Sequence, residues 1–294
     1  MTVRRRLVTV PATSANLGPG FDVFAAALAL QLELEVWEAD EFGIDPGDES
    51  LPRDRSNLCV RAFEELRPAD GVSFELTSQI PLARGLGSSA AAIVAGLMAA
   101  DHMYELALSR EEIYERAVAL EGHPDNVAAA IYGGFVMCPR PEEESLPAPV
   151  RIEPPEGVEA IIVFPADEVS TAEARAALPA EVPFADAIEN VAAASQLALG
   201  LERSDLALIR RGLADRLHQP PREALYGRSM ELVRAAPAMG ALGATISGAG
   251  PTVLVWSFWQ DTGSVVSALE DWTGDWAEVL RVPFSPTGAD VPEI

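Results

Sequence analysis

The sequence predicts a protein of mixed α and β structure, of the α+β or α/β class, divided into two domains. Patterns typical of strands and of helices occur in both halves of the chain, as in mixed folds. The length of 294 residues suits two domains of ordinary size. Between residues 139 and 157, six prolines and the run Glu142–Glu144 indicate a connection between domains or a long surface hairpin. We therefore expect domains at residues 1–150 and 151–294.

The first half is expected to begin with a strand at residues 7–10 and a turn-rich loop at 11–22. Apolar and polar residues alternate over 30–36, which predicts a strand with one solvated acidic face. The acidic segment 38–57 is expected to be a solvated loop, and residues 72–76 are expected to form a further strand.

Three helices are expected next, over residues 88–106, from Ser109 onward and over 123–131. Ser109 with Glu112 has the pattern of a capping box. The remaining expected elements are strands at 135–137, 160–164, 244–247, 253–256 and 278–282 and helices at 185–201, 204–217, 221–235 and 262–272.

The composition is strongly acidic and contains no lysine. The formal net charge is −24, and all 21 basic residues are arginine. Such a chain suits concentrated salt, where the Debye length is about 3 Å at 1 M and self-repulsion is screened. We therefore expect a protein of a salt-accumulating halophile, with a GC-rich codon bias as the alternative cause. The charge argues against nucleic acid or anionic membranes as partners.

A cytoplasmic location is expected, because no signal peptide is recognisable at the N-terminus. The longest apolar run, residues 90–100, is shorter than the roughly 20 residues that cross a bilayer. Cys59 and Cys138 are too few for a disulfide framework, and both are expected in the core.

The most informative stretch is a glycine-rich turn that leads into the Ala-rich helix. Its backbone N–H groups lie at the positive end of the helix dipole, where an anion is stabilised. Gly85 and Gly87 allow positive φ and close approach of a ligand, and two serine hydroxyls can hold phosphate oxygens or Mg²⁺. An ordinary helix N-cap is the alternative. The expected nucleotide-binding residues are Pro81, Leu82, Ala83, Arg84, Gly85, Leu86, Gly87, Ser88, Ser89, Ala90 and Ala91.

Three segments in this order resemble the three motifs of the GHMP small-molecule kinases: Pro11–Asp22 (PATSANLGPGFD), the glycine-rich turn and Thr245–Thr252 (TISGAGPT). The first segment, with Gly122–Asn126 (GHPDN) and Ser170–Arg175 (STAEAR), is most similar to the homoserine kinases. The resemblance covers nearly the whole chain. It implies an α+β fold of two domains, the first like ribosomal protein S5 domain 2 and the second ferredoxin-like, with ATP and the substrate between them.

The resemblance places substrate contacts at Asn16, Asp22, His123, Arg175 and Arg222. Homoserine carries an ammonium, a carboxylate and a hydroxyl group. Asp22 can accept a hydrogen bond from the ammonium, and the two arginines can hold the carboxylate. Each residue also has a plainer alternative role, as a turn former, a helix start or a surface ion pair, and the match at Arg222 is the loosest.

Ser89, Glu115 and Thr171 are the expected Mg²⁺ ligands; the resemblance supports Glu115, for which a solvated helix carboxylate is the alternative. His123 and Asn126 are assigned to the catalytic centre, where His123 can also orient the hydroxyl. No carboxylate base is firmly implied. We expect the hydroxyl proton to leave late, because phosphoryl transfer depends mainly on positioning and charge neutralisation.

The expected activity is ATP-dependent phosphorylation of the L-homoserine hydroxyl, giving O-phospho-L-homoserine and ADP in threonine biosynthesis. ATP and Mg²⁺ are the implied cofactors. Kinases of this family are often homodimers, although the sequence identifies no interface. Two alternatives stay open: a related kinase for mevalonate, shikimate or a sugar, and a non-catalytic ligand sensor on the same fold.

Overall fold

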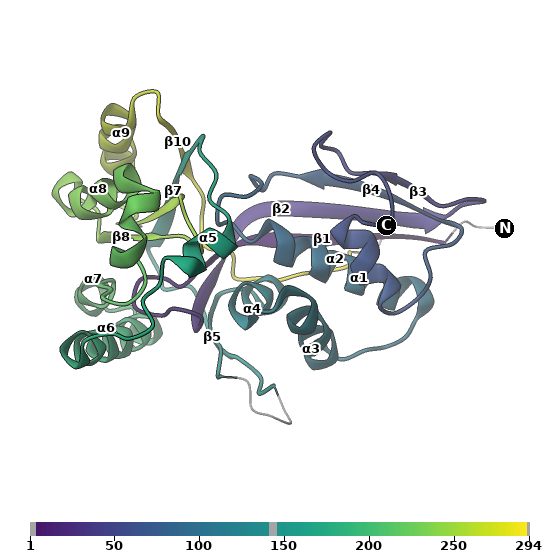
Figure 1. The fold of residues 1–294 in the computed structure, drawn as a ribbon, viewed down its shortest axis with the longest axis horizontal. Coiled ribbons are helices and arrows are strands. Elements are labelled where there is room, and N and C mark those ends of the chain that lie inside the picture. The colour runs from purple at the N-terminus through teal and green to yellow at the C-terminus, as the bar shows by residue number, and fades with distance from the viewer. Residues whose placement is uncertain (1–3, 141–145, 293–294) are drawn as a thin grey trace.

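The structure is a computed structural model that describes residues 4–140 and 146–292. It contains a six-stranded sheet in the N-terminal half and a four-stranded sheet in the C-terminal half, which lie at the two ends of an elongated molecule (Figure 1). The predicted α+β class is confirmed. The glutamate run 142–144 lies outside the described residues.

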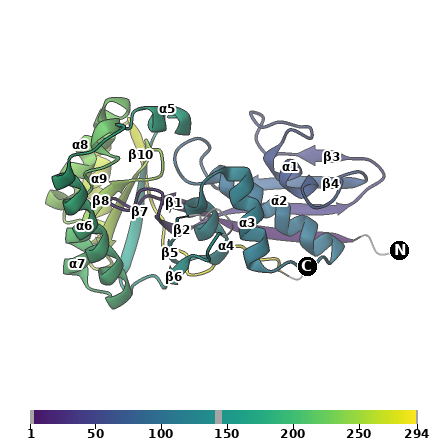
Figure 2. The same ribbon diagram turned by 60° about the horizontal axis from the view of Figure 1, so that its bottom comes forward.

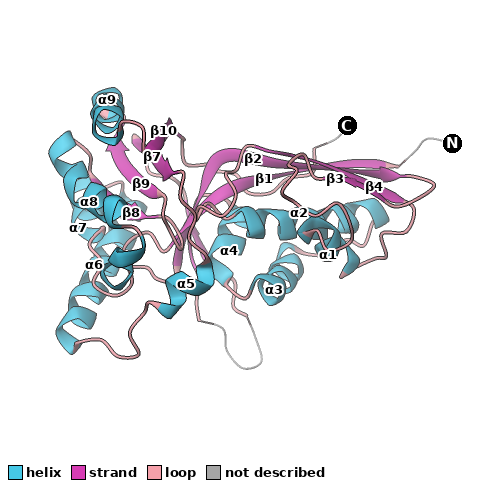
Figure 3. Cartoon of the chain, turned by 45° about the horizontal axis from the view of Figure 1, so that its top comes forward, coloured by secondary structure: helices cyan, strands magenta, loops and turns pink. Residues whose placement is uncertain are grey.

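The first sheet has the order β3-β4-β2-β5-β6, and β1 pairs with β2 along most of its length. Its strands are β1 (Arg5–Ala15), β2 (Phe24–Glu38), β3 (Gly43–Asp45), β4 (Val72–Ser78), β5 (Phe135–Met137) and β6 (Val150–Ile152). β3 runs parallel to β4, and the other pairs are antiparallel. One face of the sheet is covered by the helices α1 (Leu58–Glu64), α2 (Ser88–Tyr104), α3 (Arg110–Glu121) and α4 (Pro124–Tyr132), as Figure 3 shows.

The first strand is longer than predicted and includes part of the expected loop 11–22. The register with β2 shifts between Pro11 and Ala12, because proline has no N–H for the ladder. Pairing then resumes as far as Ala15, and this part of the strand is buried. The loop therefore begins only at Asn16.

Helix α2 is buried along most of its length, which accounts for its small residues. Of its 17 residues, 12 are buried. A Cβ on Gly96 would lie 2.1 Å from the carbonyl oxygen of Cys59 in α1, so the two helices cross in close contact. The capping box predicted at Ser109 is present at the start of α3.

The second sheet has the order β10-β7-β9-β8 and is antiparallel throughout. Its strands are β7 (Val158–Pro165), β8 (Gly243–Ile246), β9 (Val253–Phe258) and β10 (Ala277–Arg281). The helices of this half are α5 (Thr171–Ala176), α6 (Phe184–Arg203), α7 (Leu206–Gly212), α8 (Gly227–Ala235) and α9 (Thr262–Thr273), with short 3₁₀ helices η1 (Pro220–Leu225) and η2 (Ala236–Met239). This strand order, with helices between β7 and β8 and between β9 and β10, is the ferredoxin-like arrangement that the resemblance implied.

Two helices of the second half differ from the prediction. The helix expected over 204–217 ends at Gly212, and the one expected over 221–235 is divided into η1 and α8. Between α7 and η1, the Asp215 carboxylate accepts hydrogen bonds from the backbone N–H groups of residues 217, 218 and 219. These contacts hold a turn that begins before the expected end of the first helix at residue 217.

The two domains share hydrophobic core at their joint. Trp256 of β9 stacks on Phe135 of β5 with 5.6 Å between ring centroids, and Phe284 lies 4.6 Å from Phe135. Phe284 belongs to the segment after β10, which returns to the first sheet and bridges to Leu28 and, through Asp290, to Thr9. Figure 2 shows the labelled ends of β1 and β2 beside the second sheet. The last segment of the chain therefore fastens one domain to the other.

Two further observations concern the described residues as a whole. None of the helices in these ranges combines the length and the apolar character needed to cross a membrane. Cys59 and Cys138 are buried free thiols, which agrees with their predicted place in the core.

Candidate active site

The three sequence motifs meet at one cavity between the two domains. The cavity has a volume of about 210 Å³ and is lined by the loop after β1, the turn before α2, the start of α4, helix α5 and the β8–β9 turn. Residues 15–22, 83–89 and 248–249 therefore lie side by side although they are far apart in the sequence.

The glycine-rich turn leaves the N-terminus of α2 open. Gly85 and Gly87 have φ values of +76° and +70°, and Gly87 is an N-cap without a side-chain hydrogen bond to the helix. A Cβ on Gly87 would lie 1.9 Å from Thr13 Oγ1, so glycine is required there. The unpaired N–H groups and the helix dipole make this turn suitable for an anion.

The residues predicted to bind the nucleotide divide into those that face a cavity and those that support the turn. Ala83, Arg84, Gly85, Gly87, Ser88 and Ser89 line the cavity. Leu86, Ala90 and Ala91 are buried in the core, so only their backbone is available to a ligand. Pro81 precedes the turn, and Leu82 lines a second cavity. The Arg84 guanidinium donates to the carbonyl oxygen of Ala166 at 3.2 Å.

Glu121, at the C-terminal end of α3, is the carboxylate that reaches this turn. Its Oε2 accepts a hydrogen bond from Ser89 Oγ at 2.7 Å, and burial raises the pKa of the Glu121 carboxyl. Glu115, the residue expected to bind the metal, is exposed and is not among the residues that line the cavity. Six residues of helix separate the two carboxylates by about 9 Å along the axis and about 120° around it. The structure therefore brings Glu121 to Ser89 in place of Glu115.

Asp22 and Arg175 form a bidentate ion pair at the other end of the cavity. The distances are 2.6 Å from Arg175 Nη2 to Asp22 Oδ1 and 3.1 Å from Nη1 to Oδ2. The Arg175 guanidinium carbon also lies 5.3 Å from the centroid of the Phe21 ring. Thr171, at the start of the same helix α5, is exposed and lines the cavity.

Arg222 is buried behind this pair, with 2% of its surface exposed, and still lines the cavity. Its Nε donates to the carbonyl oxygen of Ala174 in α5 at 2.8 Å. Its guanidinium carbon lies 5.1 Å from the Phe21 ring centroid, on which Arg175 also packs. The surface ion pair that was the alternative for Arg222 is therefore wrong, and both predicted carboxylate-binding arginines share one aromatic support.

Asn16 joins the first motif to the third. Its Nδ2 donates to the carbonyl oxygen of Gly248 at 2.8 Å, and its Oδ1 accepts from the backbone N–H of Asp22 at 3.0 Å. The Ser247 hydroxyl adds a second connection by donating to the carbonyl oxygen of Gly85 at 2.6 Å. Asn16 lines the cavity, but its amide already shapes the loop that presents Asp22.

The start of α4 brings His123, Asp125 and Asn126 to the cavity. Asn126 Oδ1 accepts a hydrogen bond from Thr13 Oγ1 at 2.8 Å. Burial, and secondly the nearby Arg175, lower the pKa of His123, while burial raises the pKa of Asp125 to about 7. Near neutral pH the His123 ring is therefore neutral and the Asp125 carboxyl is only partly ionised.

A second cavity lies on the other side of Ser88 and Ser89 and has a volume of about 440 Å³. It is bounded by the segment from Pro46 to Leu58, by the end of β4 and by the first turn of α2. The sequence assigned residues 38–57 to a solvated loop. This holds for most of 46–57, which is exposed and contains no helix or strand, whereas the first part of the segment contains the strand β3. The sequence signal for this cavity is the set of apolar residues at positions 51, 52 and 58 within an otherwise acidic segment.

Two α+β domains, with a glycine-rich turn of the first domain facing the cavity between them, define the class of the GHMP kinases. The model of the GHMP kinases N-terminal domain matches residues 57–134, and the model of the GHMP kinases C-terminal domain matches residues 197–277. A mevalonate kinase of L. major, solved with R-mevalonate, shares the fold with a TM-score of 0.70 and 18% identity over 98% of this chain and 97% of that one.

Closer relatives narrow the assignment. The homoserine kinase of Microchaete diplosiphon is 41% identical over 96% of this chain and 95% of its own length, and that of Thermus thermophilus is 41% identical over 90% and 91%. The crystal structure of homoserine kinase from Cytophaga hutchinsonii superposes with a TM-score of 0.88 at 29% identity, covering 98% of both chains. The chain therefore belongs to the homoserine kinase family of GHMP kinases.

Proposed function

We propose that the protein transfers the γ-phosphoryl group of ATP to the hydroxyl of L-homoserine, giving O-phospho-L-homoserine and ADP in threonine biosynthesis. The observation that carries the proposal is the grouping of Asp22, Arg175 and Arg222 in a small cavity that opens onto the glycine-rich turn. Relatives about 40% identical to the chain bear the name homoserine kinase, which supports this choice.

The Asp22–Arg175 pair is complementary to an amino acid. A carboxylate can replace Asp22 as a partner of the arginines, while an ammonium replaces Arg175 as a partner of Asp22, so that each charge stays compensated. Both side chains are about one third exposed, at 37% and 35%, so a ligand can reach them. Mevalonate and sugars lack the ammonium group and leave Asp22 without a cation.

The two cavities on either side of Ser88 and Ser89 suit the two substrates. The larger one, bounded by Leu51, Leu76 and Ile80 among others, has room and apolar surface for a nucleoside. The open N-terminus of α2 would then hold the phosphates. This arrangement points the γ-phosphate toward the cavity that contains Asp22 and Arg175.

Ser89 and Glu121 fit the requirements of a Mg²⁺ ion, and we transfer the proposed carboxylate ligand from Glu115 to Glu121. Mg²⁺ takes one or two carboxylates with phosphate oxygens and water. Among the described residues, no group of three or more His, Cys, Asp or Glu side chains could hold a metal ion. A Mg²⁺ site completed by phosphate oxygens and water does not require such a group. Thr171 remains a proposed outer contact. A bound Mg²⁺ would neutralise charge on the transferring phosphoryl group.

For the transfer itself we propose positioning without a carboxylate base. Asn126, fixed by Thr13, and the neutral His123 ring would orient the homoserine hydroxyl. A loose transition state does not require early removal of the hydroxyl proton. The proton would then leave to the transferred phosphate or to water.

The test is an ATP-consumption assay with homoserine, mevalonate, shikimate and galactose, with ³¹P NMR of the product. Turnover is expected with homoserine, and Arg175→Met is expected to lower kcat/KM for homoserine by at least about tenfold through the lost charged hydrogen bonds. Arg281→Met is the matched control, because Arg281 pairs with Glu159 in an exposed position on the second sheet. Turnover of mevalonate without homoserine would show a related kinase, and tight binding without turnover would show a ligand sensor.

Four accompanying proposals stand on the sequence. The boundary expected at residues 150/151 falls inside β6, which pairs with β5 of the first sheet; we therefore propose that it follows Ile152, which limited proteolysis would test. A homodimer is tested by size-exclusion chromatography with light scattering, and a cytoplasmic location by cell fractionation. The proposed salt adaptation is supported by the net charge of −24 and by the absence of lysine. Thermal unfolding at increasing KCl concentration would test it.

A further inference from the structure

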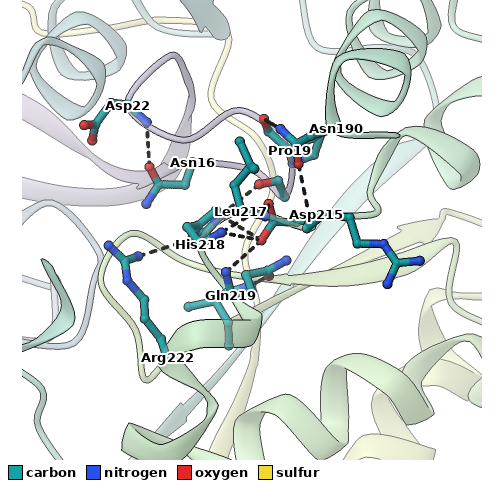
Figure 4. A network of polar contacts seen from close by, with 12 residues as sticks. Asn16, Pro19, Asp22, Asn190, Asp215, Leu217, His218, Gln219 and Arg222 are labelled. Atoms are coloured by element: carbon teal, nitrogen blue, oxygen red, sulfur yellow. Dashed lines mark hydrogen bonds and ion pairs between the residues drawn. The ribbon is translucent and has the colours of Figure 1, made fainter. Parts of the chain in front are cut away.

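A buried polar network lies behind the cavity, and its residues Asp215, His218 and Gln219 have no part in the chemistry proposed above. Figure 4 shows His218 beside Arg222, with Asp215 and Gln219 on the same turn and with the first-motif residues Asn16 and Asp22 nearby. The side chains of His218 and Asp215 are completely buried. A histidine in such a place needs partners for both ring nitrogens.

The two partners fix the protonation state of His218. Its Nε2 lies 2.8 Å from the carbonyl oxygen of Gly18, which can only accept, so Nε2 carries the proton. Its Nδ1 lies 3.2 Å from Nη1 of Arg222, which can only donate, so Nδ1 is the acceptor. The ring is therefore neutral. A second proton on Nδ1 would set two donors and two positive charges against each other.

The contact with His218 leaves part of the Arg222 guanidinium available. Of its five N–H groups, one is donated to Ala174 and one to His218. The Tyr226 side chain is a further hydrogen-bonding neighbour of the guanidinium, which still leaves two N–H groups for a ligand. Because Nε and Nη1 are both held, the plane of the guanidinium is fixed, and Arg222 lines the cavity in that orientation.

His218 also supports the aromatic ring on which both arginines pack. The rings of His218 and Phe21 are stacked with 5.3 Å between their centroids and 27° between their planes. Phe21 contacts the guanidinium groups of Arg175 and Arg222 and directly precedes Asp22. The His218 imidazole therefore stacks on the aromatic ring that contacts both arginines proposed to bind the substrate carboxylate.

The turn that carries His218 is held from three sides. Asp215 accepts the backbone N–H of His218 at 3.1 Å. Gln219 Oε1 accepts from the N–H of Ile246 in β8 at 2.7 Å. Asn190 of α6 accepts from the N–H of Arg216 and donates to the carbonyl oxygen of Pro19 in the first motif. Hydrogen bonds within the second domain therefore fix the position of the imidazole, and the imidazole and Asn190 in turn contact the first-motif loop at Gly18 and Pro19.

We propose that His218 is a positioning residue, which as its neutral Nε2–H tautomer holds the Arg222 guanidinium in the orientation that receives the substrate carboxylate. The inference rests on the proposed function, because it assumes that Arg222 binds that carboxylate. It goes beyond that function by assigning a role to a residue that does not itself contact the substrate.

The charged groups around His218 favour this neutral state. Burial lowers the pKa of the imidazole, and Arg222 of η1 acts in the same direction. Asp215, with Oδ2 3.7 Å from Nε2, acts in the opposite direction, as does Asp22 on the first-motif loop more weakly. Arg175 of α5 is the other charged group nearby, and its guanidinium packs on Phe21.

The test uses two substitutions that each keep one half of the imidazole. His218→Gln retains a donor in reach of Gly18 but loses the acceptor next to Arg222, whereas His218→Asn retains an acceptor at the Nδ1 position and loses the contact to Gly18. His218→Gln is expected to raise KM for homoserine about tenfold or more, with KM for ATP changed less than about threefold. His218→Asn is expected to rescue most of that loss.

Two comparisons separate positioning from mere packing. In an Arg222→Met background, His218→Gln should add little further loss, because residues that act through one another are not additive. With 3-aminopropan-1-ol, which is homoserine without its carboxylate, His218→Gln should leave kcat/KM within about twofold. Equal effects of Gln and Asn, or full additivity with Arg222→Met, would overturn the positioning role while homoserine turnover by the unaltered protein upholds the proposed function. An unaltered protein that neither binds nor phosphorylates homoserine would overturn both.

A measurement on the unaltered protein covers the case in which the variants do not fold. The chain has three histidines, so long-range ¹H–¹⁵N correlation spectra can resolve each ring. The His218 imidazole is expected to stay in the neutral Nε2–H form from about pH 8 down to about pH 6, through the usual titration range of histidine. Its proximity to the Phe21 ring distinguishes it from His123, whose pKa is also lowered. A spectrum in which all three rings titrate normally, or in which the protected ring carries its proton on Nδ1, would overturn the proposal.

Discussion

Gly85→Ala tests whether the glycine-rich turn and the β8–β9 turn must touch for the site to form. A Cβ at this position would lie 2.2 Å from the carbonyl oxygen of Ser247 and 3.2 Å from two backbone atoms of Gly250. Carbon and carbonyl oxygen approach to about 3.3 Å at the closest, so the two turns must separate by about 1 Å. The hydrogen bond from Ser247 Oγ to the Gly85 carbonyl would be lost with that movement.

The expected cost has two parts. An alanine with φ near the observed +76° costs about 1–2 kcal/mol, and the lost hydrogen bond costs about 1 kcal/mol more. Gly240→Ala is the matched control, because Gly240 has a φ of +96° and its added Cβ meets only Val265 Cγ2 at an ordinary 3.6 Å. Gly240→Ala should therefore show only the cost of the positive φ and not that of a lost hydrogen bond.

Urea unfolding and steady-state kinetics measure the two variants side by side. Gly85→Ala should be the less stable by about 1 kcal/mol and should lose on the order of 100-fold in kcat/KM, because a misplacement of about 1 Å at a reacting centre has that effect. Gly240→Ala should retain its kinetics. Equal losses of stability together with unchanged kinetics in both variants would refute the idea that contact between the turns builds the site.

The metal site, Asp125 and the composition allow four further predictions. Glu121→Gln should raise the Mg²⁺ concentration for half-maximal activity at least about tenfold, whereas Glu115→Gln should not; equal effects would contradict the reassignment. Asp125→Asn should lower kcat less than about tenfold, and complete loss of turnover with homoserine binding intact would show that a base is required. The pKa of Asp125 is about 7 in the folded protein and about 4 in the unfolded chain, so the folded protein binds more protons between pH 4 and pH 7. Its free energy of unfolding should therefore fall as the pH rises through that range, and it should fall less in Asp125→Asn. The melting temperature should rise from low to multi-molar KCl, given the net charge of −24, and a flat profile would count against salt adaptation.

The parts of the site that the sequence predicted are those encoded in local patterns. Gly85 and Gly87, the serines after them and the loop containing Asp22 each form one turn, so that residue type and spacing indicate their role directly. The structure places all three motifs around one cavity. The capping box at Ser109 was predictable for the same reason, since it depends on two residues three positions apart.

The parts that the sequence did not predict depend on which elements pack together. Glu115 and Glu121 lie on one helix, and the sequence alone does not say which side of α3 faces α2. The second cavity exists because the segment from Pro46 to Leu58 lies against the end of β4, a contact between distant parts of the chain that the composition of the segment does not indicate. The structure ends α7 at Gly212 and divides the expected helix 221–235 into η1 and α8. The sequence also does not indicate that the turn carrying His218 packs against Gly18 of the first motif.

The arginines of the cavity show how an acidic chain without lysine can bind anions. Arg84, Arg175 and Arg222 line it, and each is already held, by the Ala166 carbonyl, by the Asp22 carboxylate, and by Ala174 with His218. Their charges are therefore oriented before a ligand arrives, and binding exchanges one partner for another. Oriented short-range contacts are much less sensitive to salt than long-range attraction, which is screened within about 3 Å at 1 M. If the chain works in concentrated salt, preorganised guanidinium groups and backbone N–H groups would therefore be the effective means of selecting an anionic substrate.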